Sequence, residues 1–230
     1  MEMQAQQLAY ADLHRYVGDP RFVKVPVSGM LSMAYAKTRS KLINLDKAQC
    51  NFKAGTPPGA DTDTTHATPH PGTDTSFLTV VDKDGNIVSL IQSLAGAFGS
   101  GVAVQDYGII LQNRATGFTL RPGSPDVLAP HKRPFHTIIP AFMKMNIQQA
   151  LEAPRFNRLG GRGCRYVIES RVPMKTLVRL SQLGYDLRVI GPYAEYVGGG
   201  QAVLHDSATG VNYGASTPRK DGEAIPEPAP

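Results

Sequence analysis

Within residues 5–48, apolar residues recur at three- and four-residue steps, a spacing that is typical of amphipathic helices. Residues 18–20 and Pro26 interrupt the pattern, because glycine and proline break helices. The sequence therefore predicts more than one helix here, and Ser28 is the expected N-cap of the second. The apolar positions are Leu8, Ala11, Leu13, Met30, Leu31, Met33, Ala34, Ala36 and Leu42.

The segment from residue 51 to residue 74 has a different composition. It carries Gly, Pro, Thr, Asp and His and almost no large apolar side chains, so no core would hold it. We expect an exposed linker, assigned to residues 55–74, within reach of proteases or of self-cleavage. The linker separates a helical part, residues 1–54, from a second part, residues 75–230.

Beyond Thr75 the pattern becomes rich in strands. Residues 76–82 and 87–94 flank a turn with an Asp-Gly pair, which is a strong hairpin signal. Strands first, helices between and strands last predict the α+β class, as a sheet-and-helix sandwich. The further strands are expected at residues 108–111, 136–143, 200–205 and 211–215, and the helices at residues 146–153, with Asn146 as N-cap, and 173–184.

Composition and charge add little to this picture. A chain of 230 residues with 41% hydrophobic content can bury one sizeable core, or one domain plus an arm. The formal net charge is +5, aromatic residues make up 7% and Trp is absent. No nucleic-acid motif accompanies the one dense basic cluster, so we interpret it as a solvated loop and expect no nucleic-acid partner. The cluster consists of Arg155, Arg158, Arg162 and Arg165.

The candidate metal and redox residues form no recognisable motif. Cys50 and Cys164 have neither zinc-like nor redox-motif spacing, so the first interpretation is two unpaired, partly buried thiols, with a disulfide as the alternative. His66 and His70 lie in the linker without carboxylate or Cys companions. We expect no metal site and no cofactor, and the redox compartment stays open.

No membrane or targeting segment is expected. No apolar stretch is long enough to span a bilayer, and the N-terminal segment MEMQAQQLAYADLHRY has neither a basic n-region nor an apolar h-region. We expect a soluble chain without a membrane partner, in a compartment that the sequence does not identify.

Residues 75–101, TSFLTVVDKDGNIVSLIQSLAGAFGSG, closely resemble the start of the small subunit of the gamma-glutamyltranspeptidase family. Its members are N-terminal-nucleophile hydrolases, so the resemblance implies self-cleavage between Asp74 and Thr75. The freed Thr75 then supplies a hydroxyl nucleophile and an α-amino group as its base. The alternative is that Thr75 only opens a strand. A Thr-Thr-His motif at residues 64–66 copies the family's cleavage point, but only Thr75 stands directly before the strand.

Ser93 falls where the family has a hydroxyl that hydrogen-bonds the nucleophilic threonine and assists self-cleavage. The alternative is a strand serine that faces a neighbouring strand. Two residues on, Ala95 stands where transpeptidases have Asn, which removes one polar contact to the threonine. This departure weakens transpeptidation more than hydrolysis.

The substrate side departs further from the family. Asn113 matches a region whose polar and acidic side chains grip the α-ammonium of a glutamyl group, but Arg114 and Gly117 replace two of those side chains. A guanidinium repels an ammonium and pairs with a carboxylate, so we expect a small anionic amide rather than glutathione. The Asn-Arg pair resembles the amidohydrolase-like and acylase-like branches, including the oxamate amidohydrolases. His136 and Thr137 lie where transpeptidases hold the substrate carboxylate, or are ordinary strand residues.

The resemblance also implies that parts of the enzyme are absent. Between Met143 and Asn146, where this chain has two residues, family members have a strand, a Gly-Gly turn and a helix. That turn supplies backbone N–H groups to the oxyanion, and one lost donor costs about 10²- to 10³-fold in rate. Residues 198–200 match a different place in the family. Met1 looks like an internal start, so the large-subunit half of the pocket is expected to be a missing partner.

We therefore expect a fragment or internally deleted form of a gamma-glutamyltranspeptidase-like precursor, with an incomplete sandwich of the N-terminal-nucleophile hydrolase type. Residues 1–54 are then a helical remnant of the large subunit, residues 55–74 a linker that ends at the cleavage site, and residues 75–230 a small-subunit-like α+β domain. The expected product is an N-terminal threonine amidohydrolase with a small-molecule amide substrate. The alternatives are a catalytically dead remnant or assembly module, and a glutathione hydrolase or gamma-glutamyl transferase.

Overall fold

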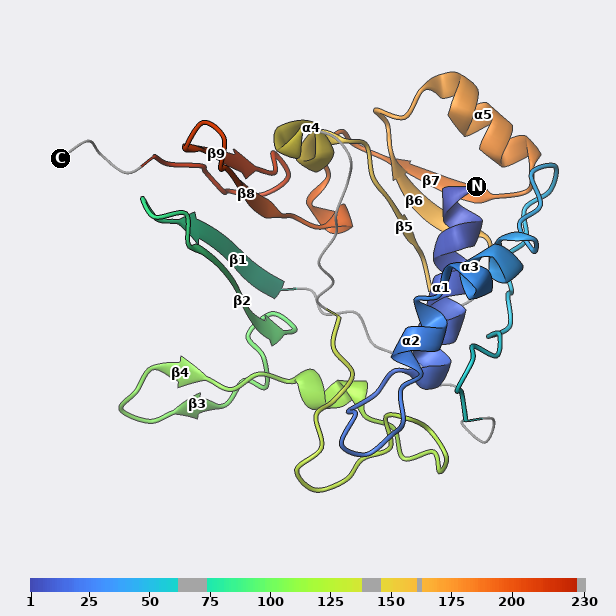
Figure 1. Ribbon diagram of the computed structural model, residues 1–230, viewed down its shortest axis with the longest axis horizontal. Coiled ribbons are helices and arrows are strands. Elements are labelled where there is room, and N and C mark those ends of the chain that lie inside the picture. The colour runs from blue at the N-terminus through green and yellow to red at the C-terminus, as the bar shows by residue number, and fades with distance from the viewer. Residues whose placement is uncertain (62–73, 138–145, 161–162, 227–230) are drawn as a thin grey trace.

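The N-terminal part of the chain is helical, as the apolar spacing predicts. Ser28 lies inside the second helix, so its prediction as an N-cap is wrong. Ser32 has that role for the third helix, because its Oγ accepts a hydrogen bond from Tyr35 N at 3.2 Å. The helices are α1, Glu2–Tyr16, α2, Val27–Met30, and α3, Met33–Ser40. The computed structural model describes residues 1–61, 74–137, 146–160 and 163–226 (Figure 1).

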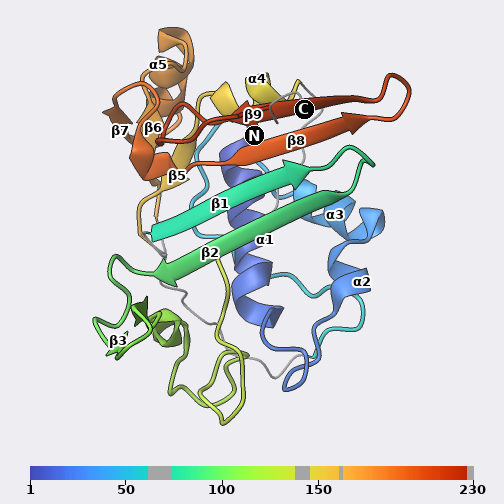
Figure 2. The same cartoon turned by 90° about the vertical axis from the view of Figure 1, so that its left-hand side faces the viewer.

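Two antiparallel hairpins lie side by side in the molecule (Figure 2). Asp82 closes the turn of the first by accepting hydrogen bonds from Asp84 N and Asn86 N, both at 2.9 Å. Gly85 adopts the positive φ of 80° that this turn needs. Both predicted strand pairs are confirmed. The first hairpin pairs β1, Asp74–Val81, with β2, Ile87–Ala95, and the second pairs β8, Gln201–Asp206, with β9, Val211–Ser216.

A three-stranded sheet lies beside the helical part. Its first two strands are antiparallel, and a helix crosses over to the third, which is parallel to the second. The sequence pattern does not predict these strands, because they are only three to five residues long, too short for a clear alternation of apolar and polar positions. The strands are β5, Phe156–Arg158, β6, Arg165–Glu169, and β7, Asp186–Ile190, and the crossover helix is α5, Met174–Gln182.

The remaining elements are short. α4, Ile147–Glu152, confirms the helix predicted at residues 146–153, and Asn146 caps it by accepting hydrogen bonds from Gln148 N and Gln149 N. α5 confirms the other. The predicted strand at residues 136–143 lies outside the described residues except for its first two, which belong to no strand. The small elements are β3, Ala103–Val104, β4, Ile109–Ile110, η1, Arg114–Gly117, and η2, Glu195–Val197.

The core lies between the start of α1 and the three-stranded sheet (Figure 1). Tyr166 and Ile168 of β6 are at most 2% exposed, and Gln7 of α1 donates its Nε2 to the Tyr166 hydroxyl at 2.5 Å. The helical part and the second part therefore share one core. Its other buried members are Met3, Cys50, Leu177 and Tyr185.

The described start of the predicted linker region, residues 51–61, is joined to α1 by hydrogen bonds at Gly55. Asp12 Oδ1 accepts a hydrogen bond from Gly55 N, the Tyr16 hydroxyl donates to Gly55 O, both at 2.7 Å, and Pro57 is buried. These contacts hold Gly55 against α1, while most of this portion is exposed or half-buried, so the linker assignment stays a prediction. The rest of the predicted linker, with its two histidines and its Thr-Thr-His motif, lies outside the described residues.

The basic cluster is not a solvated loop at two of its positions. Arg155 and Arg158 each donate to a backbone carbonyl oxygen, at 2.8 and 2.9 Å. Burial lowers the pKa of both guanidinium groups from the ordinary value, since desolvation disfavours the charged form. Arg165 is exposed and pairs with Asp186, and Arg162 lies outside the described residues.

Cys50 and Cys164 form a disulfide. The interpretation as two unpaired thiols is therefore wrong, and the alternative holds. Sequence spacing could not decide this, because 114 positions separate the two cysteines and only the packing of residues 48–51 against the sheet brings them together.

Candidate active site

Thr75 lies at an irregular point of the first hairpin. Asp74 is paired with Ala95 and Ser76 with Gln92, so the register shifts across Thr75. The threonine is exposed, and its Oγ1 donates a hydrogen bond to Ser93 Oγ at 3.0 Å. The antiparallel register thus brings together the two hydroxyls that the sequence singles out.

Ser93 Oγ is the centre of a small network. Besides the hydroxyl of Thr75, it accepts hydrogen bonds from Ala95 N at 3.0 Å and from Arg114 Nη2 at 2.8 Å. Ala95 is buried and has a φ of 74°, a left-handed conformation in which Asn is tolerated better than Ala. The chain therefore bends sharply after Ser93, and this bend turns the Ala95 N–H back onto the hydroxyl.

Arg114 is held at this network from two directions. Asn113, directly before it, donates its backbone N–H to Leu94 O at 3.0 Å and accepts a hydrogen bond from Gly96 N on its Oδ1 at 2.8 Å. The guanidinium also donates Nη1 to Thr137 Oγ1 at 3.1 Å. Arg114 thus connects the end of β2 with the segment that contains His136 and Thr137.

Gly117 and Phe135 are close neighbours. A Cβ added at Gly117 would lie 3.2 Å from Phe135 O, which is tighter than ordinary contact. A side chain here would require its neighbours to shift slightly, so glycine is the residue that fits without adjustment. It also leaves Arg114 without a carboxylate partner among the described residues, so its positive charge is not neutralised there.

His136 adjoins the same charge. Loss of hydration, and secondly the positive charge of Arg114, lower the pKa of His136 from its ordinary value. The lowered pKa favours the neutral form of the imidazole. This form can accept or donate one hydrogen bond there but adds no positive charge to the site.

The structure thus gathers Thr75, Ser93, Arg114 and Thr137 into one chain of hydrogen bonds, with Asn113 fixing Arg114 and His136 beside it. Sequence reasoning missed that Asn113 anchors the backbone at Gly96 and that Arg114 contacts Ser93. The one local signal is the Ala95-Gly96 pair at the strand end, since a glycine there permits close approach of another side chain.

No group of three His, Cys, Asp or Glu side chains that could hold a metal ion occurs in the described residues. In the same part of the chain, no helix has the length and apolar character needed to cross a membrane.

Comparison with known proteins gives consistent relatives. The family model described as gamma-glutamyltranspeptidase matches residues 1–144. A glutathione hydrolase proenzyme of Bacillus subtilis is 30% identical over an alignment that covers 96% of this chain and 43% of that protein. An oxamate amidohydrolase proenzyme of Klebsiella pneumoniae is 28% identical, with coverages of 96% and 46%.

A solved structure resembles the whole fold. The cephalosporin acylase from Bacillus halodurans superimposes with a TM-score of 0.78 at 31% identity, covering 99% of this chain and 45% of the acylase. The chain therefore spans less than half the length of these relatives. The alignment with the B. subtilis protein runs over 260 positions, more than the 230 residues of the chain, so that relative carries residues without a counterpart here.

Proposed function

Because the chain belongs to the gamma-glutamyltranspeptidase family, we propose that it is a fragment or internally deleted form of such a precursor, which cleaves itself between Asp74 and Thr75. The product is an N-terminal threonine amidohydrolase that acts on the amide bond of a small anionic molecule. The observation that carries the proposal is the 3.0 Å hydrogen bond between the hydroxyls of Thr75 and Ser93 at the irregular end of the hairpin.

Self-cleavage begins when Thr75 Oγ attacks the carbonyl carbon of Asp74. The C–N bond breaks, the Thr75 nitrogen takes up the proton that the hydroxyl loses, and an ester joins Asp74 to Thr75 Oγ. Water then hydrolyses this ester to a carboxylate at Asp74 and a free Thr75. Ser93 positions the attacking hydroxyl. It is a weak base, because Ala95 N and Arg114 already donate to its oxygen.

After the cut, Thr75 has both groups that amide hydrolysis requires. Its α-amine takes the proton from its own hydroxyl, which attacks the substrate carbonyl. The amide C–N bond then breaks, the leaving nitrogen takes up that proton and departs as the amine or ammonia, and an ester remains on Thr75 Oγ. Water hydrolyses this ester, which releases the product acid and restores the Thr75 hydroxyl. Ser93 again holds the hydroxyl in place. This division of roles needs no metal.

Arg114 favours an anionic substrate. Two of its N–H groups hold Ser93 and Thr137, and a guanidinium has five, so others remain for a carboxylate. With the neutral form of His136 favoured, Arg114 is the charge that selects the substrate. A glutamyl donor would bring an α-ammonium toward this cation, and Gly117 offers no acidic group to hold it.

Two observations support an internal deletion. The family model stops matching at residue 144, next to the position where the oxyanion turn is expected, and the relatives' extra residues need a place in the alignment. We propose that the missing strand, turn and helix belong there. Without that turn, turnover by this chain is low even after the cut.

An exposed apolar face supports an incomplete sandwich. Leu78 pairs with Leu90 and Val80 with Val88 across the first hairpin, so all four side chains lie on one face, where they are 46% to 57% exposed. Monomeric proteins rarely leave such a face open. We propose that the large-subunit portion, of which residues 1–54 are the remnant, covers it next to a small-subunit-like domain of residues 75–230.

The test is the mass of purified protein during incubation, measured after denaturation with reductant. We expect two polypeptides whose new termini are Asp74 and Thr75, and no cleavage in Thr75→Ala. Thr75→Ser is the matched control, because it retains the hydroxyl and should still cut. A new terminus at Thr65, or unchanged cleavage in Thr75→Ala, would contradict the assignment.

A chain that never cuts would instead favour the catalytically dead remnant or assembly module. A cut chain that binds a glutamyl amide better than a small anionic amide would favour the glutathione hydrolase. Comparing the two ligands on the cut protein therefore separates the remaining alternatives.

A further inference from the structure

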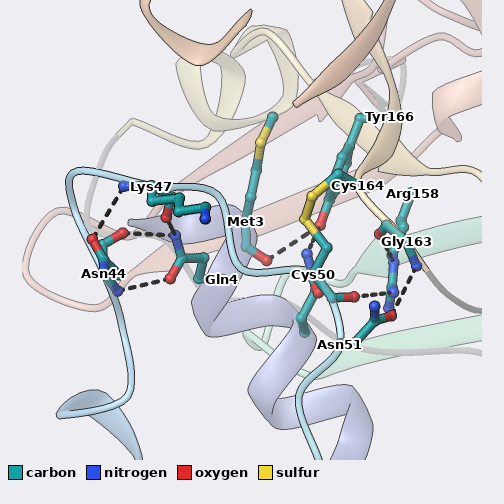
Figure 3. Close-up of a disulfide and its surroundings, with 11 residues drawn as sticks. Met3, Gln4, Asn44, Lys47, Cys50, Asn51, Arg158, Gly163, Cys164 and Tyr166 are labelled. Atoms are coloured by element: carbon teal, nitrogen blue, oxygen red, sulfur yellow. Dashed lines mark hydrogen bonds between the residues drawn. A yellow bond between two sulfur atoms is a disulfide. The ribbon is translucent and has the colours of Figure 1, made fainter. Parts of the chain in front are cut away.

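The disulfide lies across the proposed cleavage site in the sequence, because Cys50 precedes Asp74 and Cys164 follows Thr75 (Figure 3). We propose that it keeps the two products of cleavage together as one covalent molecule. The proposal rests on the proposed function only for the origin of the cut. The link itself follows from the fold and applies to any break between Asp61 and Thr75.

The cysteines are presented by segments that are fixed on both sides. Ala48 N donates to Leu183 O at 2.7 Å, just before Cys50. Arg158 donates Nη2 to Cys50 O at 2.9 Å, and Gly163 N donates to the Asn51 side chain at 3.2 Å (Figure 3). Each of these hydrogen bonds joins the N-terminal part to the second part. The disulfide therefore closes an interface that the backbone has already aligned.

The link borders the buried core. Cys50 is 9% exposed and belongs to the core with Tyr166, and Cys164 packs against the same cluster. Tyr166 lies under the first turns of α1. Its hydroxyl accepts a hydrogen bond from Gln7 Nε2 and donates one to Met3 O at 3.4 Å. The core thus covers Cys50, whereas Cys164 is only partly buried.

The link changes how the cut protein behaves on dilution. Without the disulfide, the N-terminal product would be held only by the non-covalent contacts of α1 and residues 48–61. The fraction of this product that stays bound would then depend on protein concentration. With the disulfide, binding becomes intramolecular and independent of concentration. The helical part then stays beside the threonine-bearing part through cleavage.

Formation of the link requires an oxidant. The two thiols lose two protons and two electrons to the disulfide of a thiol–disulfide exchange partner, which becomes two thiols, and the Cys50–Cys164 bond forms. Oxidised glutathione supplies this disulfide in vitro.

The experiment makes the cut independent of self-cleavage. A recognition sequence for a site-specific protease replaces residues 64–70 in a Thr75→Ala background, and the protein is folded with oxidised and reduced glutathione. After digestion and quenching with iodoacetamide, its mass is measured under denaturing conditions with and without reductant. We expect one species of full mass without reductant and two with it.

Matched variants and a second readout complete the test. Cys50→Ser, and separately Cys164→Ser, should give two species without reductant. The unsubstituted chain should take up no iodoacetamide when it is denatured without reductant, a measurement that does not depend on the folding of a variant. Two separate polypeptides from the digested cysteine-containing protein, or two alkylated cysteines, would overturn the proposal. Failure of the unmodified chain to cut itself would contradict only the proposed function.

Discussion

The end of the first hairpin and the core around β6 are stabilised in different ways. At the hairpin end, Thr75 is exposed, and a few hydroxyls and one guanidinium hold the network together. In β6, the four residues from Tyr166 to Glu169 are at most 2% exposed, and a disulfide joins distant segments beside them. Hydrogen bonds that water can replace contribute little net stability, whereas buried contacts contribute much more. The site should therefore control chemistry and the core should control stability.

The most buried ion pair among the described residues joins Arg219 to Glu169 of β6. Arg219 donates Nε and Nη2 to the two carboxylate oxygens of Glu169 at 2.7 and 2.6 Å, with both side chains fully buried. Burial alone would raise the pKa of Glu169, but hydrogen bonds from Arg219 and from the backbone N–H groups of Arg155 and Ala194 lower it. The pair fastens the C-terminal segment to the end of β6.

Removing one partner of this pair should have the largest effect on stability. Arg219→Ala leaves the Glu169 charge buried and unpaired, so we expect the free energy of unfolding to fall by about 3 to 5 kcal/mol. Urea unfolding followed by circular dichroism measures the loss. Arg165→Ala is the matched control, because it breaks an exposed ion pair to Asp186 and should cost less than about 1 kcal/mol. Equal losses would show that burial does not distinguish the two regions.

Ser93→Ala should change the rate of self-cleavage rather than the stability of the fold. Removing the hydroxyl breaks the hydrogen bond between Ser93 and Thr75 Oγ1, so we expect self-cleavage to slow by about 10²-fold. The free energy of unfolding should change by less than about 1 kcal/mol, because Ser93 is only half-buried. Mass measurements over time give the rate, with Ser93→Thr as the control that retains a hydroxyl. A large loss of stability with an unchanged rate would reverse the assignment of the two regions.

Arg114→Ala tests selectivity within the site. Binding of a small anionic amide such as oxamate to the cut protein should weaken by about 1.5 to 3 kcal/mol, the scale of a hydrogen bond to a charged group. Titration calorimetry measures this change. The affinity of Arg114→Lys for this ligand should lie between those of the unsubstituted protein and Arg114→Ala, because lysine keeps the charge but loses the planar set of N–H donors. A neutral amide of the same size should bind all three proteins with the same affinity. If Arg114→Ala weakened the binding of the anionic and the neutral amide equally, recognition by charge would be contradicted.

The buried carboxyl group of Asp126 should make the stability of the fold depend on pH. Its side chain is fully buried, and burial raises its pKa from 3.8 to about 6, against the opposing charge of Lys132. Between these values the folded state binds more protons than the unfolded state, so the free energy of unfolding should fall as the pH rises from about 4 to 6. We expect a loss on the order of 1 to 2 kcal/mol.

Urea unfolding at several pH values measures this slope. The side chain of Asp126→Asn cannot titrate, so the free energy of unfolding of this variant should vary less with pH over the same range. Asp186→Asn is the control, because that carboxylate is exposed. An identical slope in Asp126→Asn would show that another group titrates.

Local patterns predicted the elements that depend on neighbouring residues. The Asp-Gly turn gives the first hairpin, and Asn146 caps α4 with its own side chain. The segment from Thr75 to Gly101 was enough to indicate the family. These features were readable because turn geometry, capping and a continuous motif involve residues close together in the chain.

Tertiary structure alone decided the contacts between distant segments. The disulfide, the burial of Arg155 and Arg158 and the three-stranded sheet all depend on residues that are far apart in the sequence. The same is true of the hydrogen bonds from Arg114 to Ser93 and Thr137. The sequence named the residues of the candidate site, but packing determined which of them touch, because the free energy of a long-range contact depends on the burial and alignment of both partners.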